Sequence, residues 1–577
     1  MLSLFKTVPV AFLVSAHAAA VPPDAGSLGN QLRQMSPPAS PARKTPPLDI
    51  PSSGHLSHEI SPGSTTRVTL RHVRFEGDVQ LAGIPPSRLE DAVAGYLGTP
   101  QTFAGLQSMT DTITALCRAE GLLAARATLP PQTVKDGVLR IRIIAGHYDA
   151  GKIKNTSAMK TSVAQRLVSV TTPQGELIRR AQLEREALLL SELPGVSARI
   201  SLMPGDAPGT SAPVVDIQPG SRISGYAGLD NQGDKTTGRS RAVAGLQVNN
   251  PLGLGDRLSL DLMDAWEKSD LFSGSLGYSL PAGGYGTRVG GGYSHLNYRY
   301  ILLQNSFSGY SDNWGLYVTH PYVRSAAARA DIRLDGGQQF LTDKYPSVIS
   351  GNADSRARKV VNTLSPSLTG SAAFIPGGVS GFSLRGTLGD VDYRNNLARL
   401  MSFSNESGTA GSFMRLNWAV NHEQTLWGPV SVYGSLSGQL ADHNLDSSQK
   451  LLLGGPAGVR AYDTGDGSVT EGTLFTAEVR NRWTLPVPVA GNNPDLTIAA
   501  FFDQGAGEQY DSNRSRSGGM LTSHNRVNLS GAGLYTTLSE SGRYALTLTW
   551  AHRTGEADPV SGQGDRDRFW VSAVKSF

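Results

Sequence analysis

A single arginine stands in the glycine-rich stretch LLLGGPAGVRAYDTGDG, which covers residues 451–467. A surface turn needs glycine for its backbone, but it has no need of Val459 and Arg460 held between the glycines. A guanidinium group binds a carboxylate through two parallel hydrogen bonds. The chemistry to expect here is therefore an ion pair that anchors the stretch to an acidic side chain elsewhere.

Asp503 is one acidic side chain whose surroundings would favour such a partner. It follows the segment LTIAAFF, in which alternate residues point to opposite faces of a strand. Phe501 shares the face of Asp503, whereas Ile498 and Phe502 lie on the opposite, more apolar face. A carboxylate in a partly desolvated place prefers an opposite charge and hydrogen-bond donors. The alternative is that Arg460 is a solvent-exposed loop residue without a partner.

Residue patterns typical of catalysis are missing from the sequence. It contains neither a G-x-S-x-G elbow nor a G-x-x-x-x-G-K-[ST] phosphate loop. His422 and Glu423 begin like a zinc motif, but Leu426 stands where the second histidine is needed. The single Cys117 excludes a disulfide framework and a multi-cysteine metal site. We therefore expect no enzyme, no cofactor and no metal site.

Composition and charge narrow the class of protein. The chain has 577 residues, 66 of them glycine, and only 17% are charged, which favours many strands joined by glycine-rich turns. The net charge of +4 is spread without a long basic run, so we expect no nucleic-acid partner. Residues 1–20 have the basic start, apolar run and small-residue end of a secretory signal peptide. No later stretch approaches 18 consecutive apolar residues, so no transmembrane helix is expected.

The part of the chain before the strands divides into three regions. Residues 21–66 are rich in proline and predict a linker, except that Leu28, Leu32 and Met35 have the spacing of a short amphipathic helix. A frayed tail is the alternative for this segment. Residues 67–147 and 148–220 each show the order strand, helix, helix, strand, strand, which indicates two small α/β units.

Residues 221–577 have strand periodicity almost throughout. In TLFTAEVRNRW, for example, Phe475 and Val479 share an apolar face, and Glu478 and Arg480 share the polar one. Segments of about ten residues with this alternation, separated by turns, are typical of a transmembrane β-barrel. Glu478 and Arg480 would then be charges in the barrel lumen. A soluble β-sandwich is the alternative, but it must explain why so many apolar faces carry aromatic residues.

The stretch around Arg460 resembles the inward-folded loop of two-partner-secretion transporters. These are the TpsB-type haemolysin secretion and activation proteins, outer-membrane barrels that carry POTRA domains. The resemblance extends over nearly the whole chain, and a second family element, F-x-D-x-G, includes Asp503. The residues that carry it are Gly454, Gly455, Pro456, Val459, Arg460, Tyr462, Gly465, Asp466 and Gly467 in the loop, and Phe501, Asp503 and Gly505 in the second element.

The resemblance implies a mainly β fold, with a sixteen-stranded barrel in the outer membrane after two POTRA-like domains in the periplasm. It also implies that Arg460 and Asp503 lock the inward loop, with Gly454, Gly455, Pro456, Val459 and Tyr462 shaping it, and that the helix at Leu28, Leu32 and Met35 plugs the resting pore. Two positions depart from the family pattern. Ala461 stands where glycine is usual and would be strained if its φ were positive. Lys575 stands where such barrels often carry an aromatic residue and could extend its ammonium group to the membrane rim.

We therefore predict a transporter that binds an unfolded partner protein in the periplasm and passes it through the barrel to the cell surface. The expected partners are a large secreted cargo of adhesin or haemolysin type, outer-membrane lipid and the barrel-assembly machinery. One alternative is an insertase that assembles other barrels, which more POTRA units would favour. A solute porin or receptor is a further alternative, but it has no need of two periplasmic units.

Overall fold

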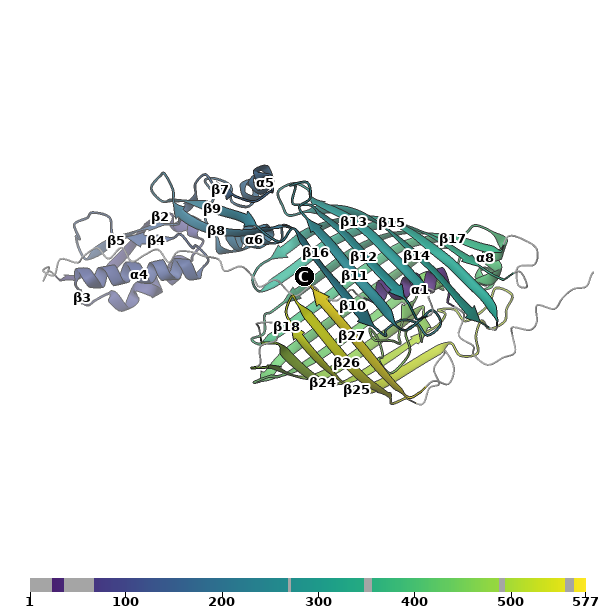
Figure 1. Cartoon of the computed structure of the whole chain (residues 1–577). Helices are drawn as coiled ribbons and strands as arrows, with labels where there is room; N and C mark the ends of the chain where they lie inside the picture. Colours follow the sequence, from purple (N-terminus) through teal and green to yellow (C-terminus); the bar gives the residue numbers. More distant parts are fainter. Residues whose placement is uncertain are drawn as a thin grey trace, which may run out of the picture.

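The computed structural model describes residues 23–35, 67–267, 271–302, 304–346, 355–486, 493–555 and 565–577. The expected signal peptide (1–20) and most of the expected linker (21–66) lie outside the described residues. The chain is elongated, with two small α/β units at one end and a large barrel at the other (Figure 1). No helix of the described part is long and apolar enough to cross a membrane.

Sixteen antiparallel strands close into a barrel, which confirms the expected fold class. The barrel closes where its first strand, β10, pairs with its last, β27, over five residue pairs from Tyr226↔Ser576 to Asp230↔Ser572. The strands are β10 (Ile223–Asp230), β11 (Arg241–Asn249), β12 (Arg257–Ala265), β13 (Leu271–Pro281), β14 (Arg288–Leu302), β15 (Asn305–Arg324), β16 (Ala328–Lys344), β17 (Arg356–Ala372), β18 (Gly378–Tyr393), β19 (Gly411–Trp427), β20 (Val430–Ala441), β23 (Glu471–Thr484), β24 (Asp495–Glu508), β25 (Arg526–Glu540), β26 (Tyr544–Arg553) and β27 (Asp567–Ser576).

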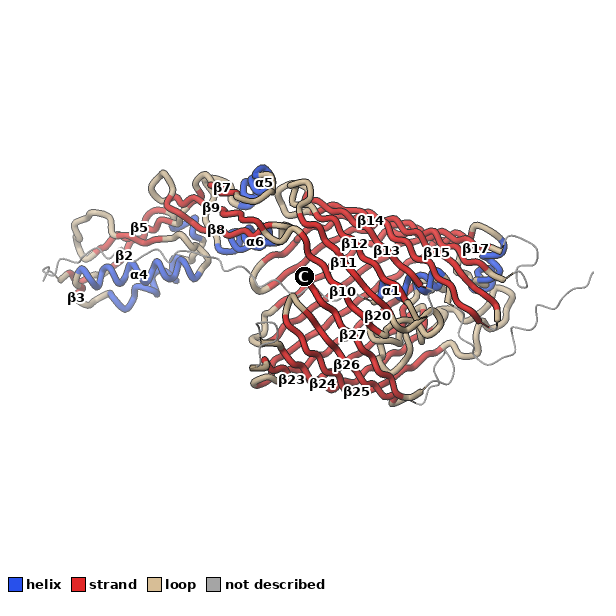
Figure 2. The backbone as a smooth tube through the Cα atoms, in the orientation of Figure 1, coloured by secondary structure: helices blue, strands red, loops and turns tan. Residues whose placement is uncertain are grey.

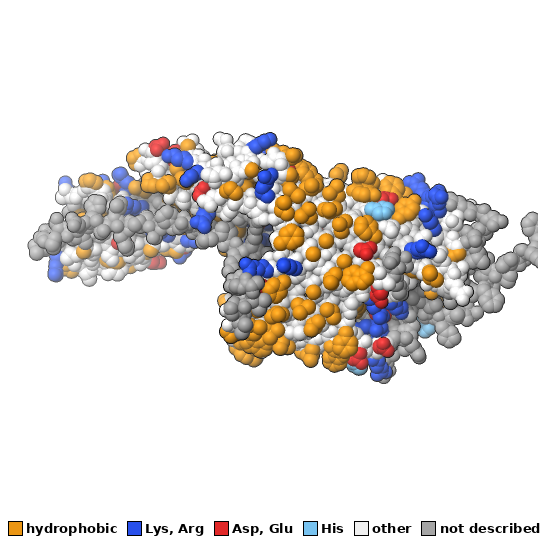
Figure 3. All heavy atoms as spheres, viewed as in Figure 1, with side chains coloured by type: hydrophobic (Ala, Val, Ile, Leu, Met, Phe, Trp, Pro, Cys, Tyr) orange, Lys and Arg blue, Asp and Glu red, His pale blue; other side chains and the backbone are white. Residues whose placement is uncertain are grey.

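The alternation in the sequence determines which side chains face outward. On β23, Val479 is 55% exposed, whereas the neighbouring Glu478 is only 7% exposed and faces the interior. Phe475 and Trp483 lie on the same outer face as Val479 and are also exposed. Hydrophobic side chains spread over the outer wall of the barrel in the same way (Figure 3). This is the side-chain distribution of a barrel surrounded by lipid.

The first α/β unit packs helices against a three-stranded sheet of order β2-β5-β4, with a separate pair of short strands, β1 and β3. Its core is apolar and includes Cys117, which is fully buried. The elements are β1 (Val68–Thr69), β2 (His72–Gly77), α2 (Val79–Ala82), α3 (Pro86–Val93), the 3-10 helix η2 (Ala94–Tyr96), β3 (Pro100–Gln101), α4 (Phe103–Ala119), β4 (Arg126–Thr128) and β5 (Val138–Ile144).

The second unit has a four-stranded sheet in which β9 pairs with β8 on one side and with β6 and β7 on the other. It contacts the barrel directly, because Arg185 donates to the carbonyls of Pro321 and Tyr322 and Arg324 pairs with Glu192 at 2.8 Å. The elements are β6 (His147–Tyr148), β7 (Lys152–Asn155), α5 (Thr161–Thr171), α6 (Arg180–Ser191), β8 (Val196–Pro204) and β9 (Thr210–Pro219).

Two elements occupy the barrel interior. Helix α1 (Ala25–Gln34) contacts β14, β15 and β16, and Figure 2 shows it within the ring of strands. The second element is the loop between β20 and β23, which contains the 3-10 helix η3 (Ser447–Gln449) and the short strands β21 (Leu451–Leu452) and β22 (Ser468–Val469). Two further helices, α8 (Asn396–Met401) and α9 (Ser404–Ser407), follow β18.

Candidate functional site: the inward loop and the helix in the lumen

The inward loop, residues 442–470, folds back on itself before it contacts the wall. Strands β21 and β22 pair through Leu451↔Val469, and the N–H of Val459 donates to the carbonyl of Leu453 at 2.7 Å. Gly455 has a φ of +111°, a backbone conformation that glycine adopts without strain. Apolar packing of Val459 and Tyr462, both fully buried, holds the tip of the loop. The arginine between them is thereby directed at the barrel wall.

Arg460 forms a two-point ion pair with Asp503 of β24. Its Nε donates to Oδ2 and its Nη2 to Oδ1, each at 2.8 Å, and its backbone N–H donates to Oδ2 at 3.1 Å. Asp503 is only 1% exposed, so the pair lies away from water. The two residues that the sequence singled out are brought together with the fork geometry that suits a guanidinium and a carboxylate.

The aromatic and polar residues around this pair come from several strands. The ring of Phe501 lies 3.5 Å from the guanidinium carbon of Arg460, a cation–π contact. Thr476 donates its hydroxyl to Asp503 at 3.0 Å, and Trp570 donates its indole N–H to the carbonyl of Arg460 at 2.7 Å. Sequence reasoning had named Phe501 but neither Thr476 nor Trp570. Both lie on inward faces of their strands, so alternation was the available signal.

Glu478 and Arg480 extend the network along β23. Arg460 also donates to Glu478 at 2.8 Å, and Glu478 accepts from Arg480 at 2.8 Å and from the hydroxyl of Tyr535 at 2.9 Å. Arg480 in turn pairs with Glu423 at 2.7 Å. Cations and carboxylates therefore alternate along the wall, and each buried charge has an opposite charge beside it.

A second ion-pair site lies three residues further along the loop. Asp463 pairs with Arg239 at 3.2 Å and with Arg568 at 2.9 Å, and its backbone N–H is capped by Asp466 at 3.0 Å. These partners were missed, because nothing in the sequence indicates which lumen arginines lie opposite the loop.

The remaining loop residues set the close packing. A methyl group at Gly505 would lie 3.1 Å from both Leu474 and Val459, and one at Gly454 would lie 2.9 Å from the carbonyl of Asp463. Pro456 lines a small cavity between the loop and α1. The glycines and Pro456 thus allow the loop to approach β24 and the helix closely.

Ala461 does not have the strain that a positive φ would impose, because it is absent from the residues of the described part that have one. Its methyl group is buried against Gly531 of β25, where an added methyl would lie only 2.5 Å away. The fit depends on glycine at 531.

Helix α1 makes polar contacts with the barrel wall and with the inward loop. Asp24 caps it by accepting from Ser27 at 2.7 Å, and its carboxylate pairs with Lys359 of β17 at 3.0 Å and accepts from Ser447 at 2.8 Å. Asn30 and Arg33 donate to the carbonyls of Lys450 and Ser448. These contacts connect the helix to β17 and to the inward loop.

The three residues that predicted the helix contribute apolar and sulfur contacts. Leu28 is buried in a cluster with Tyr298 and Leu341, and Leu32 packs against that cluster. The sulfur of Met35, just after the helix, accepts from Arg241 at 3.2 Å. The polar residues that tie the helix down were not predicted, because most of their partners are backbone carbonyls of the loop.

The described residues contain no group of three or more His, Cys, Asp or Glu side chains placed to hold a metal ion. What the arrangement offers instead is a set of reversible polar contacts between the wall, the loop and the helix.

Comparisons with known proteins agree with this architecture. Residues 68–146 match the model of the POTRA domain, ShlB-type, and residues 209–339 match that of the haemolysin secretion/activation protein ShlB/FhaC/HecB. The chain is 30% identical to the heme/hemopexin transporter protein HuxB of Haemophilus influenzae (strain 86-028NP) over 99% of this chain and 98% of that one. It is 24% identical to the outer membrane transporter CdiB of Dickeya dadantii over 76% of each chain.

Among solved structures, CdiB from Escherichia coli has a similar fold, with a TM-score of 0.67 and 20% identity over 91% of this chain and 93% of that chain. The similarity to HuxB over almost the whole of both chains, together with the closed barrel and the ShlB-type domain, shows the family. The chain belongs to the haemolysin secretion/activation family, the outer-membrane transporters of two-partner secretion, whose POTRA domains lie in the periplasm.

Proposed function

We propose that this transporter exports one large exoprotein by opening a lumen that helix α1 and the inward loop occupy at rest. The carrying observation is that both elements are held in the barrel by side-chain contacts that can be exchanged for contacts with water or cargo. The proposal needs no nucleotide hydrolysis, since folding of the cargo outside the cell would draw the chain outward. No nucleic acid or cofactor has a part in it.

Strand β8 of the second POTRA-like unit is the site that we propose for the cargo in the periplasm. Among the described strands it pairs only with β9, so one edge of its nine residues offers backbone donors and acceptors. An extended chain can add to such an edge through main-chain hydrogen bonds, whatever its side chains are. This mode suits a cargo that arrives unfolded.

The plug and the lock have different parts in the proposal. Release of α1 would open the pore, because the helix lies across the lumen between β14–β16 and the inward loop. The pair of Arg460 and Asp503 would keep the loop on the wall, so that it shapes the path of the cargo. The helix and the loop are coupled, because the N–H of Leu452 donates to the side chain of Gln34 at 3.2 Å.

The relative HuxB is a heme/hemopexin transporter by name, and its similarity spans nearly the full chain. We propose that the cargo is an exoprotein that binds heme or hemopexin, in place of the broader adhesin or haemolysin type. Insertion of the barrel itself would use outer-membrane lipid and the barrel-assembly machinery. An insertase function has less support, because the family match is to secretion proteins.

Co-expression tests the export function. The chain and a candidate exoprotein, sought first among the products of neighbouring genes, would be produced together in a host that lacks both. The exoprotein would then be measured in the medium and in the periplasm. Exoprotein in the medium only when the transporter is present supports export. Exoprotein retained or degraded in the periplasm, with the barrel correctly inserted, would contradict it.

A further inference from the structure

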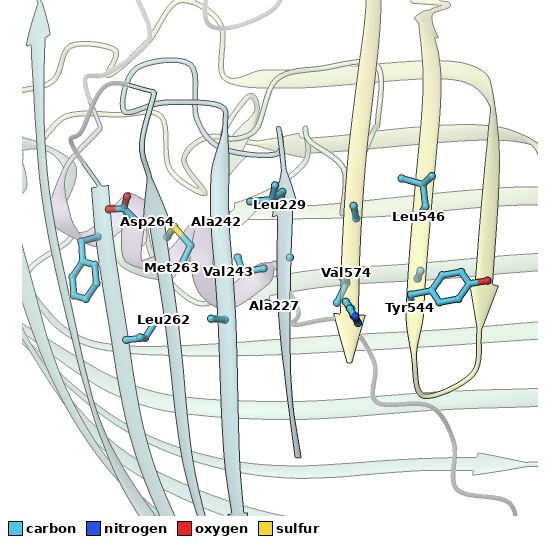
Figure 4. Close-up of a pocket in the computed structure, with 16 residues that line it drawn as sticks. Ala227, Leu229, Ala242, Val243, Leu262, Met263, Asp264, Tyr544, Leu546 and Val574 are labelled. Atoms are coloured by element: carbon cyan, nitrogen blue, oxygen red, sulfur yellow. The ribbon is translucent and has the colours of Figure 1, made fainter. Parts of the chain in front are cut away.

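A shallow groove crosses the outer surface of the barrel where the first and last strands meet. It has a volume of about 760 Å³, within the range of small-molecule sites, and its lining is almost entirely apolar. Figure 4 shows that its labelled residues come from both sides of the closing pair, Ala227 and Leu229 from β10 and Val574 from β27. The groove therefore lies over the seam between β10 and β27.

Strand register explains the groove. One row across the strands reads Tyr544, Lys575, Ala227, Ala244 and Leu262, all on the outer face. The next row reads Leu546, Ala573, Leu229, Ala242 and Asp264. Alanine at four adjoining outward positions leaves a floor without side-chain bulk, and larger apolar residues border it on either side. The hollow is thus encoded by small residues on the seam strands.

The two ends of the groove differ in charge. Lys575 is exposed on the outer face two residues before the C-terminus, at the end of the barrel nearest the POTRA-like units. Its neighbour in the row, Tyr544, begins β26 directly after the turn at that same end. Asp264 borders the groove near the far end of β12 and is also exposed. No ion pair is seen for Lys575 among the described residues.

We propose that this groove binds a phospholipid of the periplasmic leaflet, with one acyl chain on the alanine floor and the phosphate beside the ammonium group of Lys575. Bulk lipid also offers apolar contact, so hydrophobicity alone gives no preference. Preference comes from the closer packing of a chain in the hollow and from the attraction between phosphate and ammonium. Asp264 repels an anionic headgroup from the other end, which fixes the orientation of the lipid.

The positions of the two charges in the groove also favour a lipid of the periplasmic leaflet over one of the outer leaflet. Lipopolysaccharide carries its phosphates in the outer leaflet, on the side of Asp264 and away from Lys575. A phospholipid places its phosphate at the periplasmic rim, where Lys575 lies. The residue that departs from the usual aromatic of the family thus acquires a specific partner.

The test is native mass spectrometry of the full-length, delipidated protein titrated with dioleoyl phosphatidylglycerol. Ala244→Leu fills the floor with a residue that lipid tolerates and is expected to weaken binding about tenfold. Lys575→Gln is expected to weaken it about fivefold, while binding of dioleoylglycerol, which lacks the phosphate, stays unchanged. The control is Ala500→Leu on β24, an exposed alanine on the outer face away from the seam. Heat-modifiable gel migration shows that each variant is folded.

A phosphatidylglycerol with a photoreactive acyl chain then locates the site. Cross-links concentrated on β10, β11, β26 and β27, and lost in Ala244→Leu, support the proposal. Cross-links spread evenly around the barrel would overturn it, as would equal affinities for Ala244→Leu and the parent protein. Binding of lipopolysaccharide but not phosphatidylglycerol would also overturn it, because the phosphate would then lie at the wrong end.

Discussion

The barrel lumen and the second POTRA-like unit both bury carboxylates, but they neutralise them in different ways. In the lumen, Asp503 receives Arg460 and Asp446 receives Lys359 at 2.9 Å. In the POTRA-like unit, Glu186 on α6 is fully buried, no described residue forms an ion pair with it, and burial raises its pKa to about 8. Asp503 and Asp446 are thus neutralised by paired cations, whereas Glu186 is neutralised by a proton.

The paired carboxylates belong to contacts that join two segments of the chain, whereas the protonated Glu186 does not. Arg460 connects a loop to a strand, and Lys359 connects β17 to both η3 and α1. A protonated Glu186 connects nothing beyond its own unit. We infer that the paired charges mark the contacts used in transport, and that Glu186 bears on stability alone. The following changes test this contrast, from the largest expected effect on secretion to the smallest.

Arg460→Ala is expected to abolish secretion while the barrel still inserts. It leaves the buried carboxylate of Asp503 without its cation, which typically costs about 3–5 kcal/mol. Asp503→Ala should give the same defect, and the double variant should be no worse than either single one. Exoprotein in the medium, relative to barrel in the outer membrane, is the measurement.

Arg333→Ala is the matched control for this change. Arg333 also pairs with a carboxylate, Asp335 at 2.7 Å, and lies 3.8 Å from the ring of Tyr317, but all three belong to barrel strands and not to the loop. Its removal should leave secretion near the parent level. Normal secretion by Arg460→Ala, or strictly additive defects in the double variant, would show that the ion pair has no part in transport.

Gly531→Ala is expected to reduce secretion by displacing the tip of the loop. The added methyl would meet that of Ala461 at 2.5 Å, and overpacking of this kind costs about 1–3 kcal/mol. Ala461→Gly should restore secretion in the double variant, because it removes the clashing group. Gly434→Ala on β20 is the control, since a methyl there has nothing within 4 Å. A defect that persists in the double variant would mean that the contact at Ala461 is not responsible.

Strand alternation in the sequence predicted the barrel, whereas the resemblance to the family implied its sixteen strands and the pairing of Arg460 with Asp503. Alternation placed Asp503 and Glu478 on the lumen face, and the loop motif supplied the partner. The contacts of Trp570 and of Asp463 were not predicted, because they depend on which strands lie opposite the loop after the barrel closes. The strain expected at Ala461 was inferred from the glycine that is usual at that position. The space for its methyl group comes from Gly531, which lies 70 positions further along the chain.

Helix α1 shows the same limit. Its spacing of Leu28, Leu32 and Met35 predicted an amphipathic helix, and the structure has one there. Its position also depends on Asp24 and Asn30, whose partners are Lys359 and a backbone carbonyl. No sequence pattern indicates which backbone carbonyl will accept a hydrogen bond, so the position of the helix in the lumen could not be predicted from the sequence.

Asp24→Asn is expected to loosen the plug without preventing secretion. Asparagine can still cap α1, so the change removes only the charge that faces Lys359. Lys359 keeps Asp446, so the cost is about 1 kcal/mol. Single-channel recordings in planar bilayers should show more frequent large openings, and deletion of residues 21–36 should show them continuously. Asn395→Ala, which removes the cap of α8, is the control. Unchanged conductance in the deletion variant would contradict the hypothesis that α1 plugs the pore.

Glu186→Gln is expected to leave secretion unchanged and to alter only the pH dependence of the second POTRA-like unit. The nearby hydroxyls of Thr171 and Thr172 already donate to the carbonyls of Leu167 and Val168, so they have no proton left for an ionised Glu186. The folded unit keeps the proton up to about pH 8, whereas the unfolded chain releases it near its ordinary value of 4.5. The unfolded chain therefore binds fewer protons in that window, and the free energy of unfolding falls as the pH rises through it, by about 1.4 kcal/mol per unit at most.

Hydrogen exchange of the full-length protein, compared between variants at one pH, measures this effect. Peptides of α6, β8 and β9 should exchange alike in the parent and in Glu186→Gln at pH 5, and faster in the parent at pH 8.5. Glu184→Gln, on the same helix but partly exposed, should match the parent at both values. Lower protection in Glu186→Gln at both values would mean that the ionised carboxylate is a working acceptor, and that this region neutralises charge as the lumen does.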